Sequence, residues 1–113
     1  MVTLEELDES TWQDFLNAPI SVLMLSKNDC HSCLQLSKEL TDWESIEPVQ
    51  ANIRFGKIML DRFGMGRFKI AQPWVSNIDI MPFLAIFVNG ERVMEWSGRT
   101  RSYLQNQLEV ILG

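Results

Sequence analysis

The sequence predicts an α/β fold with a central mixed β-sheet and helices on both of its faces. Two strand-like runs, 21–25 and 53–61, are separated by a long helical segment, and a helical crossover of this kind makes its two strands parallel. Further along, Asn89-Gly90 lies between two apolar runs and is the preferred two-residue turn of an antiparallel hairpin. A sheet with both kinds of pairing is mixed, and its crossovers place helices against it.

Two helices are predicted in the first half of the chain. Ser10 with Gln13 three residues later forms a capping-box pattern, which indicates a helix over residues 10–17. A second helix is predicted over 30–47, where Pro48 would end it. The apolar run between these helices has the length of a buried strand.

The middle of the second half is irregular in sequence. Gly64, Gly66 and Pro73 interrupt the stretch 62–80, so we expect only a short helix over 67–71 and then a loop.

The end of the chain has clearer signals. The hairpin strands cover 83–88 and 91–96, Gly98 breaks the chain, and Thr100 can cap a last helix. The apolar face of this helix consists of Leu104, Leu108, Ile111 and Leu112. After the first helix, the expected order is therefore βαβα, a partly irregular crossover, and ββα.

Length and composition limit the classes of function. A chain of 113 residues can bury its own core, and we expect residues 1–113 to form a single domain. The net charge of −5 argues against a nucleic-acid partner and against an anionic membrane surface, and no apolar stretch has the length of a transmembrane helix. The N-terminus lacks the basic and apolar regions of a signal peptide, so we expect a cytoplasmic protein without membrane partners.

The motif Cys30-His31-Ser32-Cys33 contains the only two cysteines of the chain. It follows a buried strand and opens a helix, where unpaired backbone N–H groups and the helix dipole favour a thiolate. The second cysteine returns to the same helix face, so the pair can exchange two electrons as dithiol and disulfide. A disulfide at this spacing closes almost no loop, which argues for chemistry rather than for stabilisation.

Together with the other motifs, this pattern resembles the thioredoxin family over nearly the full chain. The matching features are the strand leading into Cys30 and Cys33, Lys57 and Asp61 on a central strand, Met81-Pro82 before an apolar strand, Asn89-Gly90, and Gly98 before the last helix. The resemblance implies a thioredoxin-like fold and a thiol–disulfide oxidoreductase that needs no cofactor. Its expected partners are a disulfide-containing protein substrate and a reductase or low-molecular-weight thiol for recycling.

The resemblance also implies roles for individual residues. Cys30 is the expected nucleophile and Cys33 the more buried resolving thiol. Pro82 corresponds to the family's cis-proline, and the backbone of Met81 could pair with an extended substrate segment. Lys57 matches a lysine that assists proton movement, although the sequence is equally consistent with a solvated lysine at a strand end.

Two further residues have open interpretations. His31 could stabilise the Cys30 thiolate, or it could simply point to solvent at the helix start. Asp29 would act in the opposite direction, because a neighbouring carboxylate raises the pKa of a thiol. Trp74 is the best candidate among the tryptophans for contact with a substrate, with a core position as the alternative.

The chain also departs from the family pattern. Met24 stands where the family has a buried aspartate that assists proton transfer to the second cysteine, so Lys57 lacks its usual acidic partner. Ser32 replaces the residue expected before the second cysteine, and the segment between Asp61 and Pro82 is longer than usual. Without the buried acid, we expect resolution by Cys33 to be slow.

Two alternative functions use the same residues. A binding or chaperone module could keep the fold as a docking surface with weak or no redox turnover. A zinc site would need four ligands, whereas the sequence offers Cys30, His31 and Cys33 at one place, so we expect no metal.

Overall fold

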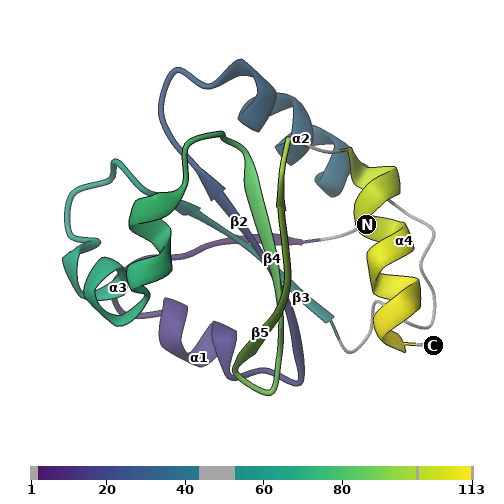
Figure 1. Ribbon diagram of the computed structural model, residues 1–113. Helices are drawn as coiled ribbons and strands as arrows, with labels where there is room; N and C mark the ends of the chain where they lie inside the picture. Colours follow the sequence, from purple (N-terminus) through teal and green to yellow (C-terminus); the bar gives the residue numbers. More distant parts are fainter. Residues whose placement is uncertain (1–2, 44–52, 99, 113) are drawn as a thin grey trace.

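The computed structural model describes residues 3–43, 53–98 and 100–112, and they form one mixed five-stranded sheet with helices on both faces (Figure 1). In sheet order the strands are β1 (Leu4–Glu6), β3 (Ile53–Met59), β2 (Ile20–Ser26), β4 (Phe83–Val88) and β5 (Glu91–Ser97). The first three pair in parallel, while β4 is antiparallel to both β2 and β5. The predicted fold class is therefore confirmed.

The helices divide between the two faces of the sheet (Figure 1). They are α1 (Trp12–Leu16), α2 (His31–Thr41), α3 (Gly66–Ala71), the 3₁₀ helix η2 (Pro73–Asn77) and α4 (Arg101–Leu112). Residues of α2 and α4 share one apolar cluster with Val22 and Met24 of β2. Residues of α1, α3 and η2 share the other cluster with Leu23 and Leu25. Because successive side chains of a strand point to opposite faces, the central strand β2 is buried on both sides.

The first helix is shorter than predicted, and Ser10 does not cap it. Helix α1 begins at Trp12 after Thr11, which makes no side-chain cap. The carboxylate of Asp8 instead accepts hydrogen bonds from the hydroxyl of Ser10 at 2.7 Å and from its backbone N–H at 2.9 Å. These bonds, the hydroxyl's first, lower the pKa of Asp8. The capping-box prediction was wrong because Ser10 is used in the turn before the helix.

Helix α2 also ends earlier than predicted. Its last residue is Thr41, and the N–H of Trp43 donates to the carbonyl of Leu40 at 3.2 Å, which closes a tighter final turn. Burial of the Trp43 ring in the core accompanies this turn. The predicted continuation over 44–47 and the stop at Pro48 lie outside the described residues.

Two elements were missed and the hairpin was confirmed. Strand β1 had no sequence signal, and η2 occupies part of the region predicted as loop. At the hairpin, Asn89 and Gly90 have positive φ values of 51° and 87°, as the predicted turn requires. None of the helices in the described part of the chain is long and apolar enough to cross a bilayer.

Candidate active site

The two cysteines lie at the start of α2 and are joined by a disulfide. Cys30 is the N-cap residue with an extended backbone, and its Cα lies 5.2 Å from that of Cys33. The backbone N–H of Cys33 donates to the sulfur of Cys30 at 3.2 Å, as it would to a capping oxygen. Cys30 is half-buried, whereas Cys33 is only 1% exposed. An incoming sulfur can therefore reach Cys30 and not Cys33.

The turn before Cys30 is held by the residues that follow β3. Asp29 has a positive φ of 57°, and the backbone N–H of Asn28 donates to the carboxylate of Asp61 at 2.9 Å. The N–H of Leu60 donates to the carbonyl of Ser26 at 2.8 Å. Asp61 was expected on the strand, but β3 ends at Met59 and Asp61 lies in the following turn. In that position its carboxylate fixes the loop that presents the cysteines.

A second loop meets the same apolar cluster as the cysteines. The peptide bond between Met81 and Pro82 is cis, as predicted. Met81 and Cys30 are both partly buried and pack against the cluster that contains Cys33. Among the described residues, no backbone group pairs with the N–H or C=O of Met81. The substrate-facing position expected for Met81 is thus open for a new backbone partner.

A row of three side chains crosses the sheet on the face that α2 covers. Lys57 is the register partner of Met24 on β2 and of Glu6 on β1, so the three side chains lie on one face. Met24 is fully buried, and its sulfur accepts a hydrogen bond from the hydroxyl of Ser37 at 3.8 Å. Lys57 is 16% exposed and its Nζ lies 3.7 Å from the carboxylate of Glu6. As expected from the sequence, Met24 occupies the register position beside Lys57, and the acidic partner of Lys57 is instead Glu6 of β1, a strand that sequence reasoning missed.

Comparison with known proteins shows which fold this geometry belongs to. No protein-family model matches the chain, and no curated protein matches it. Among solved structures, the thioredoxin of Malassezia sympodialis is similar with a TM-score of 0.74 and 18% identity, over 97% of this chain and 91% of that one. Thioredoxin O2 from Arabidopsis thaliana, in the oxidized state, gives 0.74 and 18% over 96% and 93%. The oxidised thioredoxin of Plasmodium falciparum gives 0.72 and 15% over 98% and 100%.

The chain has the thioredoxin fold. With it, the cysteine pair and the cis-proline occupy the positions that the sequence resemblance implied. At these identities the likeness establishes the fold alone, so the function is argued from the residues of the site.

The remaining predicted site residues lie at the edges of this thioredoxin-fold site. His31 is exposed at the first position of α2, and its imidazole has no hydrogen-bond or ion-pair partner in the part of the chain that the structure describes. Trp74 is half-buried on η2, where its indole N–H donates to the side chain of Gln72 at 2.8 Å. Its ring lies 5.8 Å from that of Phe83. Trp74 is therefore neither a free surface residue nor fully part of the core.

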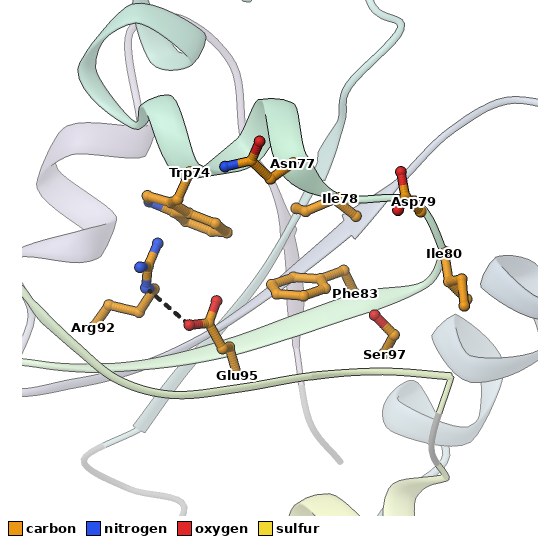
Figure 2. A pocket seen from close by; sticks show the side chains of 9 residues that line it. All are labelled: Trp74, Asn77, Ile78, Asp79, Ile80, Phe83, Arg92, Glu95 and Ser97. Carbon is orange, nitrogen blue, oxygen red and sulfur yellow. Dashed lines mark ion pairs between the residues drawn. The ribbon is translucent and has the colours of Figure 1, made fainter.

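Sequence reasoning missed a cavity beside Trp74 (Figure 2). The cavity has a volume of about 470 Å³ and lies between η2, the segment that leads to Met81, and the hairpin strands. It brings together Asp79, Arg92 and Glu95, none of which has a motif signal. No local pattern could have found it, because it depends on how η2 packs against β4 and β5.

Proposed function

We propose that the protein is a thiol–disulfide oxidoreductase that reduces or exchanges disulfides in other proteins. The observation that supports this most strongly is the asymmetry of the pair. Cys30 is accessible at a helix N-terminus and Cys33 is buried behind it, and Met81, whose peptide bond to Pro82 is cis, packs against the apolar cluster that contains Cys33. A structural disulfide has no need of an accessible sulfur at that place.

The proposed reaction starts from the reduced pair. The Cys30 thiolate, stabilised by the N–H of Cys33 and the positive helix end, attacks one sulfur of a substrate disulfide. The substrate S–S bond breaks, and the leaving thiolate takes up a proton. The Cys33 thiol then loses a proton and attacks the sulfur of Cys30, which releases the second substrate thiolate. The substrate gains two electrons and two protons, and a low-molecular-weight thiol or a reductase returns the enzyme to the dithiol.

The backbone beside the cysteines supports a polypeptide substrate. The unpaired N–H and C=O of Met81 could form a short ladder with an extended segment on one side of the attacked disulfide. Such pairing involves only the main chain of the substrate, so substrate selectivity would depend on the surrounding side chains. A cytoplasmic location, where thiols are kept reduced, would favour the reductive direction.

A second candidate, a binding module with little turnover, is favoured by exposed apolar side chains. Leu34, Phe63 and Ile80 are all exposed. They follow the ends of β2 and β3 or precede the start of β4, so they lie at the same end of the sheet as Cys30. A docking surface there would serve either function, and only the redox behaviour of Cys30 separates the two.

A redox titration of the Cys30–Cys33 pair tests the proposal. The protein is equilibrated in dithiothreitol or glutathione buffers, and its free thiols are counted by alkylation and mass. We expect one reversible two-electron transition, with a tenfold change in the equilibrium constant for about every 30 mV. If the pair stayed in the dithiol form in every oxidising buffer, the oxidoreductase proposal would be overturned and the binding module would become the better explanation.

The buried Met24 leads to a prediction about the second step. Met24→Asp puts a carboxylate beside Lys57 and inside the apolar cluster that contains Cys33, and we expect it to accept the proton that Cys33 must lose. We expect the steady-state fraction of mixed disulfide to fall roughly tenfold or more, since a positioned base contributes at least that much. The fraction is measured by acid quenching, alkylation and intact mass during turnover. Met24→Leu, which keeps the apolar volume, should behave as the wild type; equal persistence in the aspartate variant would contradict the argument.

A further inference from the structure

The cavity beside Trp74 has a mixed lining that suits a long cationic side chain. Its walls include the rings of Trp74 and Phe83 and the side chain of Ile78 (Figure 2). The carboxylate of Glu95 and the hydroxyl of Ser97 lie on the opposite side, on β5. Aromatic and aliphatic faces can cover an alkyl stem, while the oxygens can accept hydrogen bonds from a charged head.

The charges of the cavity are not balanced. Arg92 is already engaged, because its guanidinium lies 4.2 Å from the centre of the Trp74 ring and its Nε lies 3.6 Å from Glu95. Asp79 also lines the cavity, and within residues 3–43, 53–98 and 100–112 it has no ion-pair partner. One cation against two carboxylates leaves a surplus negative charge, which disfavours an acidic occupant and favours a basic one.

The cavity adjoins the loop that faces a substrate. Ile80 lines it and is followed directly in the chain by Met81 and Pro82. Phe83, the first residue of β4, lines it from the other end of this loop and is the register partner of Ser97. A polypeptide paired with the backbone of Met81 would therefore run beside Ile80, one of the residues that line the cavity.

We propose that this cavity binds a lysine or arginine side chain of the disulfide-bearing polypeptide, close in sequence to the cysteine that Cys30 attacks. The identity of the occupant as a substrate rests on the proposed oxidoreductase function. The alkyl stem lies against Phe83 and Ile78, the charged head meets Glu95, and Asp79 adds to the negative charge of the lining. The cavity thus selects substrates by charge, whereas the backbone of Met81 holds any extended segment.

Binding tests the cavity without any need for turnover. The probes are fluorescently labelled peptides closed by one disulfide, with two lysines, two alanines or two glutamates beside the first cysteine. They are titrated with the oxidised protein, which cannot attack them, and binding is followed by anisotropy. We expect the lysine peptide to bind about fivefold more tightly than the alanine peptide, as partly exposed ion pairs allow. The glutamate peptide should bind most weakly, and added salt should reduce the differences.

Matched variants locate the effect. The double variant Asp79→Asn with Glu95→Gln should remove the preference for lysine. Glu91→Gln removes one exposed charge from the same strand outside the cavity and should keep it. Circular dichroism and urea unfolding check that each variant is folded. A preference that survives the double variant, or equal binding of the three peptides to the wild type, would overturn the proposal.

Reduction of the same peptides separates this inference from the function on which it rests. With dithiothreitol as reductant, the wild type should reduce the lysine peptide with the highest kcat/KM. If all three peptides were reduced but bound equally well, the proposed role of the cavity would be overturned and the oxidoreductase function would stand. If the lysine peptide bound selectively but no peptide was reduced, binding of a basic side chain in the cavity would be supported and the oxidoreductase function would be overturned.

Discussion

Cys30→Ser should reduce the rate of disulfide reduction to that of dithiothreitol alone, whereas Cys33→Ser should leave the first attack intact and trap the mixed disulfide. Cys30 is the sulfur at the helix N-terminus that a substrate can reach, and a serine hydroxyl cannot replace a thiolate in this exchange. Cys33 is buried behind it and is needed only for the second attack. Turnover of a disulfide-closed peptide and intact mass of the protein measure the two effects.

Ser32→Ala is the matched control for the cysteine variants. It changes the exposed residue between the same two positions of the motif but keeps both thiols. We expect it to retain turnover and to accumulate no more adduct than the wild type. Full activity in Cys30→Ser, or absence of a peptide adduct in Cys33→Ser, would contradict the assignment of nucleophile and resolving thiol.

The largest loss of stability is expected for Trp43→Ala. Trp43 follows the helix that carries both cysteines, and it is only 1% exposed. Its ring meets that of Phe55 edge to face with centroids 5.9 Å apart, and the guanidinium of Arg101 lies 5.8 Å from its centre. The substitution removes contacts with β3 and α4 together and leaves a cavity. The free energy of unfolding should fall by about 3–5 kcal/mol, as measured by urea denaturation at equilibrium.

Leu34→Ala is the control for this prediction. Leu34 belongs to the same helix but is 68% exposed, so its truncation should change the free energy of unfolding by less than about 0.5 kcal/mol. Both variants are compared with the wild type in the same redox state. A loss below about 1 kcal/mol for Trp43→Ala would mean that the ring is not a packing element between α2, β3 and α4.

Local signals determined most of the elements from the sequence. Asn89 and Gly90 can adopt the two positive φ angles of a tight hairpin, and this property belongs to the residues themselves. The short helix expected at 67–71 appears as α3 for a similar reason, because the breakers around it lie close in the chain. The cysteines at the start of α2 were equally readable, since a strand followed by a helix places them there.

Errors arose where a group was engaged by a partner that the local pattern did not include. Ser10 matched a capping box, but its hydroxyl donates to Asp8 in the preceding turn. The pairing of Lys57 with Glu6 was not foreseen, because β1 is only a three-residue strand, too short for a period-2 pattern. Arg54 of β3 likewise pairs with Glu5 of β1 at 2.7 Å and with Asp14 of α1 at 3.1 Å, contacts that no local window contains.

Spacing, turn residues and apolar periodicity act over a few neighbouring residues, and these signals were enough to predict the mixed α/β sheet, the hairpin and the redox motif at a helix start. Long-range packing was needed to show that Glu6 pairs with Lys57 and that Trp74, Asp79 and Glu95 line one cavity. Those properties depend on burial and on strand register between segments far apart in the chain. They are settled by long-range packing, which leaves no pattern in any single stretch of sequence.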